Sequence, residues 1–207
     1  VSKMKKIISV LLILCVVFTA FAAKNPFASK STFAVGAYGG FGGASNSYTN
    51  NLTSIKVVTN LSGFTFGFDA NANVSDTLIA DFGIDFLMGS KFSVKTGSSV
   101  SSTEASFSVI SLKGGVDFVI EASKEVNLLI GGGASLTIVS HEDSSDNNTS
   151  MGLYGKAELD YAINKNIKLA FGGNFGFNFT NSQKKLSDKD TISSNQFAVK
   201  AGLKYAF

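Results

Sequence analysis

The 207-residue sequence is poor in the residues that most catalytic and disulfide-bonded proteins use: it has one cysteine, one histidine and no arginine. One cysteine, Cys15, cannot form an intramolecular disulfide, and one histidine, His141, leaves little material for acid–base catalysis. After residue 22 no apolar run is long enough to span a membrane as a helix, which argues against a helical membrane protein. The absence of arginine points to a genome poor in G and C rather than to a function.

The only long apolar stretch lies at the start of the sequence. A basic segment, Met4-Lys5-Lys6, precedes the apolar residues 7–20, and Ala20-Phe21-Ala22 fits a signal-peptidase site. The alternative, a membrane anchor helix, is disfavoured because the run is short and ends in a cleavage pattern. Cleavage removes Cys15 and three of the 18 lysines, which leaves 15 lysines against 15 acidic residues. The basic balance therefore gives no argument for nucleic-acid binding.

The remainder of the chain alternates apolar and other residues with a period of two, which is the spacing of β-strands. Each apolar stretch is close to the roughly 9–11 residues that a membrane-spanning strand needs. The sequence thus predicts a signal peptide at 1–22, a short periplasmic segment at 23–31 and one all-β domain at 32–207. The expected strands are 33–41, 64–73, 78–88, 110–120, 126–139, 153–163, 167–179 and 197–207.

The segments between these strands alternate in length. Polar, Ser/Thr/Asn-rich segments at 42–63, 89–109, 140–152 and 180–196 predict long loops. Short segments at 74–77, 121–125 and 164–166 predict tight turns. The pattern predicts an antiparallel up-and-down barrel with long loops at one end and turns at the other. Because eight is even, both ends of the domain are expected on the turn side.

Charge is confined to one face of every expected strand. A soluble barrel has a dry interior and a charged exterior, whereas here the face opposite the charges consists of Phe, Leu, Ile, Val and small residues. This predicts lipid outside and a polar lumen, since a lysine on the lipid face would cost roughly 2–4 kcal/mol. The predicted lumen residues are Asp69, Asp81, Asp85, Lys113, Asp117, Lys156, Glu158, Asp160, Lys168, Lys200 and Lys204.

These six acids and five lysines allow two interpretations of the lumen. Inward glycines make room for side chains that can fill an eight-stranded barrel, which favours a plug of paired charges and trapped water. The alternative is a conduit across the outer membrane: either a gated path for protons or small ions, in which lysine–carboxylate pairs exchange partners, or a side-opening route for small apolar molecules.

The last predicted strand ends on an aromatic residue with Tyr205 two positions before it. It resembles the C-terminal strand by which bacterial outer-membrane barrels are recognised by the barrel-assembly machinery. The residues that would carry this signal are Phe197, Val199, Ala201, Leu203, Tyr205 and Phe207. Aromatic residues also gather near both ends of the expected strands, as interfacial girdles do.

From residue 32 onward the chain is similar to the small eight-stranded outer-membrane barrels of the OmpA transmembrane domain and OmpX type. The resemblance implies a bacterial outer membrane location with both termini periplasmic, contact with lipopolysaccharide-type lipid, and no cofactor. It also implies a role in envelope structure or surface interaction, such as adhesion or contact with host factors, with a possible extracellular ligand at the loops.

Three other functions are weaker interpretations. A lipid-modifying enzyme would need His141 as a base beside Ser140, Ser144 or Glu142, but a solvated loop histidine is the simpler explanation. Glu142, Asp143 and Asp146 could hold Ca²⁺, yet they lack the ligand order of a calcium loop. A soluble lipocalin-like binder conflicts with the one-sided charge pattern. The expectation is a protein that is not an enzyme and binds no nucleic acid.

Overall fold

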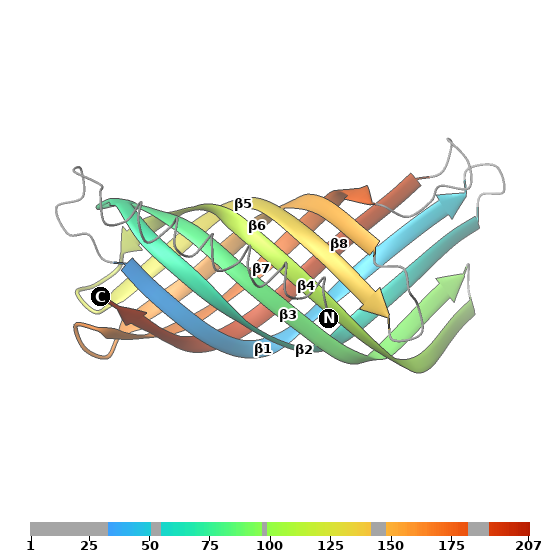
Figure 1. The fold of residues 1–207 in the computed structure, drawn as a ribbon, viewed down its shortest axis with the longest axis horizontal. Helices are drawn as coiled ribbons and strands as arrows, with labels where there is room; N and C mark the ends of the chain where they lie inside the picture. The colour runs from blue at the N-terminus through green and yellow to red at the C-terminus, as the bar shows by residue number, and fades with distance from the viewer. Residues whose placement is uncertain (1–32, 51–54, 97–98, 142–147, 182–190) are drawn as a thin grey trace, which may run out of the picture.

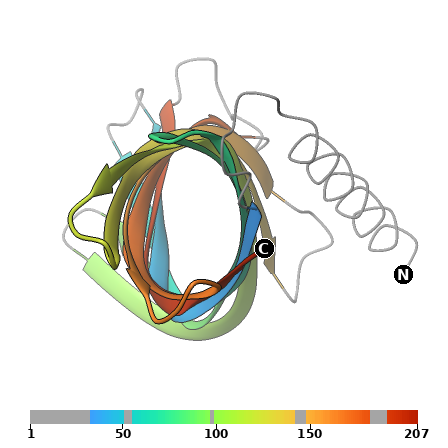
Figure 2. The same cartoon turned by 90° about the vertical axis from the view of Figure 1, so that its left-hand side faces the viewer.

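The computed structural model describes residues 33–50, 55–96, 99–141, 148–181 and 191–207. Eight antiparallel strands form a closed barrel in chain order, and β8 pairs back with β1 (Figures 1 and 2). This confirms the predicted all-β fold. The strands are β1 Phe33–Asn50, β2 Ile55–Ser75, β3 Leu78–Thr96, β4 Ser99–Glu121, β5 Val126–His141, β6 Asn148–Ala162, β7 Ile167–Asn181 and β8 Thr191–Ala206.

Pairing of the first and last strands closes the sheet. Ala34 pairs with Ala206 at one end, and Thr49 pairs with Thr191 at the other. The Phe207 N–H donates to the Phe33 carbonyl at 2.8 Å. Closure leaves no strand edge along the barrel wall, which a lipid environment requires because lipid cannot satisfy free backbone groups.

The two ends of the barrel differ. At the turn end, only residues 76–77, 122–125 and 163–166 connect the strands, close to the predicted turns. The side chain of Asn164 accepts backbone N–H bonds from Asn166 and Ile167, both at 2.9 Å, which fixes one of these turns. The beginning of β1 and the end of β8 also lie at the turn end. The opposite end, where β1–β2, β3–β4, β5–β6 and β7–β8 connect, is called the hairpin end below.

The prediction of long loops at the hairpin end is wrong for most of their length. β1 and β2 stay paired up to Asn50 and Ile55, and β3 and β4 stay paired up to Thr96 and Ser99. β6 begins at Asn148 and β8 at Thr191, both within segments expected to be loops. The error has a physical cause. Beyond the lipid, both faces of a strand meet water, so a polar sequence can form a ladder without an apolar face.

At the hairpin end β3 and β4 project beyond the described end of β5, while β8 stays paired with β1 as far as Thr49. β3 pairs with β2 as far as Thr96 and with β4 to the same residue. β5, by contrast, pairs with β4 only from Phe107 to Glu121. One extra residue in β4 shifts the register where Gly89 and Lys91 pair, which bends this hairpin. The β3–β4 hairpin can be followed beyond the end of β5 in Figure 1.

Side chains alternate strictly between the two faces of the barrel wall. From Met151 to Asp160 every odd-numbered residue is exposed and every even-numbered residue is buried. The exposed residues include large apolar side chains such as Phe64, which is 78% exposed. A continuous exposed apolar band of this kind marks a lipid-facing surface. Within the described residues, no helix is long and apolar enough to cross a membrane.

Candidate functional site: the barrel lumen

The structure places all eleven predicted lumen residues on the inner face. Ten of them are buried, and Lys168, nearest the turn end, is half-buried. The eleven come from six strands, because each strand contributes every second residue to the interior. The buried set is Asp69 of β2, Asp81 and Asp85 of β3, Lys113 and Asp117 of β4, Lys156, Glu158 and Asp160 of β6, and Lys200 and Lys204 of β8.

On the turn side of the lumen, Lys156 contacts three carboxylates. Its Nζ lies 3.0 Å from Asp81 Oδ1, 2.7 Å from Asp117 Oδ2 and 3.9 Å from Glu158 Oε1. Asp81 also accepts hydrogen bonds from Asn71 Nδ2 at 2.6 Å and from the Tyr154 hydroxyl at 3.1 Å. The cluster therefore ties β6 to β3 and β4 across the barrel.

Lys204 completes this inner cluster from β8. Its Nζ contacts Glu158 directly and lies 3.3 Å from Asp160 Oδ1 and 3.7 Å from Asp69 Oδ2. Lys168 adds a looser contact, 3.9 Å from Asp160 Oδ2. The inner cluster thus has five carboxylates, of Asp69, Asp81, Asp117, Glu158 and Asp160, against three lysines.

An outer cluster lies farther toward the hairpin end and has the opposite balance. Asp85 contacts Lys113 directly, and its Oδ1 lies 3.4 Å from Lys200 Nζ. Lys113 also donates to Asn174 Oδ1, across the barrel on β7, at 2.8 Å. Two lysines share one carboxylate here. The six acids and five lysines are therefore divided unevenly along the lumen, with excess negative charge on the turn side.

Two inward tyrosines, which the sequence analysis did not single out, join the clusters. Tyr38 of β1 donates to Asp85, and Lys200 Nζ lies 3.6 Å from the centre of its ring. Tyr154 of β6 donates to Asp81 of the inner cluster, while Lys113 of the outer cluster lies 5.7 Å from its ring centre. Their inward phase in the period-two pattern was the signal that could have revealed them.

Two layers of uncharged side chains lie between the outer cluster and the hairpin end. Gln196 of β8 reaches across the lumen, accepts from Ser111 of β4 at 2.9 Å and donates to Thr137 of β5 at 3.1 Å. Closer to the hairpin end, a buried apolar group fills the interior. That group is Ala44, Leu61, Leu87, Val109 and Val139. The sequence analysis missed this layer because it traced the lumen through charges alone.

Two small cavities remain between the side chains inside the wall. One, of about 20 Å³, lies between the outer cluster and Gln196, and the other, of about 10 Å³, lies beside Tyr38 and Lys204. The larger has room for about one water molecule. Among the described residues, side chains thus reach across the barrel at several levels, and these two cavities lie between them.

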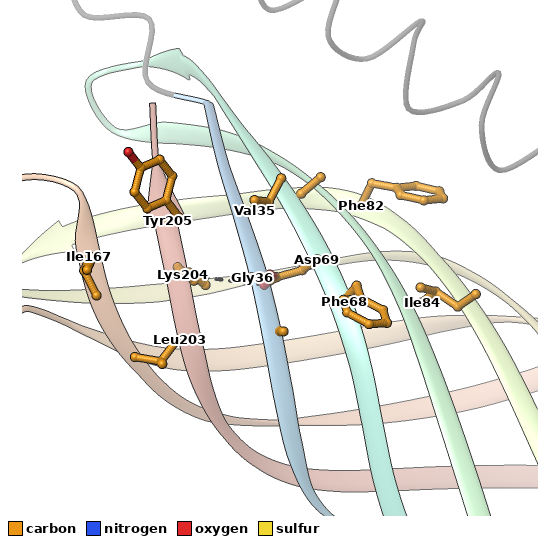
Figure 3. Close-up of a pocket in the computed structure, with 12 residues that line it drawn as sticks. Val35, Gly36, Phe68, Asp69, Phe82, Ile84, Ile167, Leu203, Lys204 and Tyr205 are labelled. Carbon is orange, nitrogen blue, oxygen red and sulfur yellow. Dashed lines mark ion pairs between the residues drawn. The ribbon is translucent and has the colours of Figure 1, made fainter.

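A larger hollow, of about 540 Å³, lies along the barrel wall over β1, β2 and β8 near the turn end (Figure 3). Its lining is mostly apolar and includes Val35, Phe68 and Leu203, which face outward. Gly36 has no side chain, and the Asp69–Lys204 ion pair lies behind it, as Figure 3 shows. The wall is therefore only one backbone thick between this hollow and the inner cluster.

The residues considered for catalysis and metal binding lie at the margin of the described chain. His141 is the last residue of β5, and Glu142, Asp143, Ser144 and Asp146 lie outside the described residues. Among the described residues, no three His, Cys, Asp or Glu side chains are arranged to hold a metal ion. The predicted signal peptide and the segment 23–31 also lie outside the described residues.

The residues of the predicted assembly signal share the lipid-facing side of β8. Each is exposed, from Phe197 at 47% to Phe207 at 65%. The Phe207 ring packs edge-on against Tyr205, with centroids 5.0 Å apart, and lies 6.0 Å from the Phe33 ring. The strand therefore presents a continuous apolar surface at the β1–β8 seam, and its recognition during assembly stays a prediction.

Comparison with known proteins agrees with this architecture. A family model described as outer membrane protein beta-barrel domain matches residues 13–207. A search of curated proteins gives no match.

Three solved structures have the same fold at low sequence identity. Neisserial surface protein A is 17% identical, covers 86% of this chain and 100% of its own, and has a TM-score of 0.58. The outer membrane protein AlkL is 11% identical, with 87% and 92% coverage and a TM-score of 0.54. OprG from Pseudomonas aeruginosa is 14% identical, with 87% and 98% coverage and a TM-score of 0.52. At these identities the similarity concerns the fold alone.

Proposed function

The chain belongs to the outer membrane β-barrel family, and within that family we propose that it is a closed envelope barrel that presents its projecting hairpins to partners outside the cell. The barrel sits in the bacterial outer membrane with its turn end, and therefore both ends of the barrel domain, facing the periplasm. Its apolar band contacts membrane lipid, and the hairpin end reaches the lipopolysaccharide-type headgroups. The β8 surface is the element that the barrel-assembly machinery binds during insertion.

The single observation that carries this proposal is the filled lumen. Gln196 crosses from β8 to β4 and β5, Lys113 from β4 to β7, and Lys156 from β6 to β3. Each link is buried and tied at both ends. Removing one partner of a buried ion pair such as Lys156–Asp81 costs about 3–5 kcal/mol, and the buried hydrogen bonds through Gln196 and Asn174 add further links that must break before the lumen opens. A barrel built this way serves as a rigid support rather than a passage.

The projecting hairpins support the second part of the proposal. β1–β2 and β3–β4 are rich in Ser, Thr and Asn beyond the apolar band, as in Ser45-Asn-Ser-Tyr-Thr-Asn50 and Ser99-Val-Ser-Ser-Thr103. They stand on a continuous ladder with the barrel wall, which holds them in a defined position. A polar surface on a rigid support is well suited to recognition of an external molecule.

We assign no catalytic activity in this proposal. Lysine and carboxylate side chains dominate the lumen, and each is held in an ion pair. The one histidine is the last residue of β5, at the hairpin end. Replacing His141 with Ala is therefore expected to leave the phospholipid and lipid A profiles of the cell unchanged, and a changed profile would contradict this assignment.

Two measurements test the proposed function. First, the folded wild-type protein in a planar lipid bilayer is expected to give no current above background, because the lumen is filled. Reproducible current steps would instead support the conduit, which is the alternative interpretation from the sequence.

Second, cells that carry a variant with the β3–β4 hairpin cut back to the level of Phe107 are expected to lose binding to host cells or matrix. The matched control is the same barrel with intact hairpins and Lys56→Ala, an exposed single change on β2.

A further inference from the structure

Two lumen tyrosines have glycines as their direct partners on both neighbouring strands, on different sides of the barrel. Tyr38 of β1 pairs directly with Gly67 of β2 on one side and with Gly202 of β8 on the other. Tyr154 of β6 pairs in the same way with Gly133 of β5 and Gly176 of β7. All four glycines are in the inward phase of their strands, so each large ring is flanked by two positions that have no side chain.

The glycines are needed for the Tyr38 ring to lie where it does. A Cβ at Gly67 would lie 2.7 Å from the Tyr38 hydroxyl oxygen and 2.9 Å from its Cε2. A Cβ at Gly202 would lie 2.6 Å from the Tyr38 Cβ. The ring therefore covers the space that a side chain at Gly67 would fill, and it reaches on to Asp85 of β3.

Each ring is held at its edge and on its face. The Tyr38 hydroxyl donates to Asp85 and its face meets Lys200, which is 9% exposed. The Tyr154 hydroxyl donates to Asp81 and its face meets Lys113, which is 6% exposed. A cation over an aromatic face is attracted by the π-electrons of the ring, and the attraction is stronger when the cation is desolvated. Among the aromatic residues whose side chains the structure describes, only these two point into the lumen.

We propose that Tyr38 and Tyr154 together form the seal of the lumen, and that the ion pairs position the rings rather than block the passage themselves. A buried lysine that contacts several carboxylates, as Lys156 does, can exchange partners, whereas the Tyr38 ring covers the space that glycine leaves open at Gly67. Loss of the Tyr38 ring would leave open the space that it covers at Gly67. This inference rests on the proposed function, that of a barrel with a closed lumen.

The experiment measures single-channel current across planar bilayers for the wild-type protein and three paired variants. The test variant is Tyr38→Ala with Tyr154→Ala. The conservative variant is Tyr38→Phe with Tyr154→Phe, which keeps both rings and removes both hydroxyl contacts. The matched control is Tyr161→Ala with Phe171→Ala, because these two rings are exposed on the lipid-facing side and lie outside the β8 assembly surface. Folding of each variant is checked by its gel mobility with and without boiling and by far-UV circular dichroism.

The alanine pair is expected to give current steps, while the wild type, the phenylalanine pair and the outward control stay silent. Added p-cresol, which has the shape of the missing side chain, is expected to reduce the current of the alanine pair in a saturable manner. If the alanine pair does not fold, Tyr38→Leu with Tyr154→Leu replaces it, since leucine keeps more buried volume but no ring.

Two results would overturn the seal. A folded alanine or leucine pair that stays silent would mean that the ion pairs, Gln196 and the apolar group nearer the hairpin end close the lumen without the rings. A phenylalanine pair that conducts as much as the alanine pair would mean that the hydroxyl contacts, not the ring volume, keep the lumen shut. In both cases a silent wild type leaves the proposed function standing, whereas current through the wild type overturns both.

Discussion

Replacing Lys156 with methionine tests how far the barrel depends on its inner cluster. The two side chains have similar length, so the change removes the charge and largely keeps the packing. Lys156 is the ammonium shared by Asp81 and Asp117, at 3.0 and 2.7 Å. Removing one partner of a buried ion pair costs about 3–5 kcal/mol. The unfolding equilibrium constant should therefore rise by roughly two to four powers of ten.

The structure also says where most of this cost arises. Asp81 keeps hydrogen bonds from Asn71 and Tyr154 in the variant, whereas Asp117 is fully buried and its described ion pair is with Lys156. An uncompensated carboxylate at Asp117 is thus the main penalty. Adding Asp117→Asn to Lys156→Met should recover most of the lost stability, and adding Asp81→Asn should recover less.

The assay is urea unfolding of the protein in lipid vesicles, followed by the boiling-dependent gel shift and by circular dichroism. The matched control is Lys168→Met, because Lys168 is half-buried and lies 3.9 Å from Asp160. An ion pair of that kind contributes about 0–1 kcal/mol. Equal destabilisation by Lys156→Met and Lys168→Met would refute the argument that the inner cluster is a buried, mutually dependent network. The argument would also be refuted if Asp81→Asn restored as much stability to the Lys156→Met variant as Asp117→Asn does.

Three further outcomes follow from the wall and the hairpins. Gly36→Ala should destabilise the barrel by about 1–3 kcal/mol, because its Cβ would lie 2.0 Å from Asp69 Oδ1. The control Gly39→Ala should leave the urea midpoint unchanged, because the nearest atom to its Cβ would lie 4.0 Å away. Equal midpoints for the two variants would contradict the packing of Asp69 behind Gly36. Phe171→Lys, on the lipid-facing side of β7, should lower the free energy of unfolding in vesicles by about 2–4 kcal/mol. Phe179→Lys, near the hairpin end, should lower it by only about 0–1 kcal/mol. A larger loss for Phe179→Lys than for Phe171→Lys would mean that the membrane band is placed wrongly. Hydrogen exchange should show protected amides in β3 and β4 as far as Thr96 and Ser99, and unprotected amides beyond Phe107 would show that the projecting hairpin is not a stable ladder.

The sequence predicted the barrel wall well because one simple rule governs it. A strand between lipid and a polar lumen must alternate, so Phe175 and Phe177 can be placed outside and Asn174 and Gly176 inside from the sequence alone. The same rule fails at the hairpin end. There both faces of β1 and β2 meet water, the alternation disappears, and polar residues that look like loop continue as strand.

The candidate site could be listed from the sequence but not assembled from it. The inward phase identified the eleven charged residues, because a charge on the lipid face is too costly. The inward phase also places Tyr38 and Tyr154 in the lumen. Their direct neighbours on the adjacent strands, however, follow only from the pairing of the strands. These neighbours are Gly67, Gly202, Gly133 and Gly176. Neighbours on adjacent strands depend on register, and register depends on how all eight strands close.

Period-two patterning and the cost of a charge in lipid were thus enough, in this sequence alone, to decide that the chain forms an eight-stranded barrel with an apolar outside and a charged inside. Tertiary structure decided which charges meet. Asp85 and Lys200 lie 115 positions apart, yet they become partners because closure between β8 and β1 sets their height in the lumen. The stagger of the strands also divides the charges into an acid-rich inner cluster and a lysine-rich outer one. No local pattern encodes that division, because it depends on the length and pairing of every strand at once.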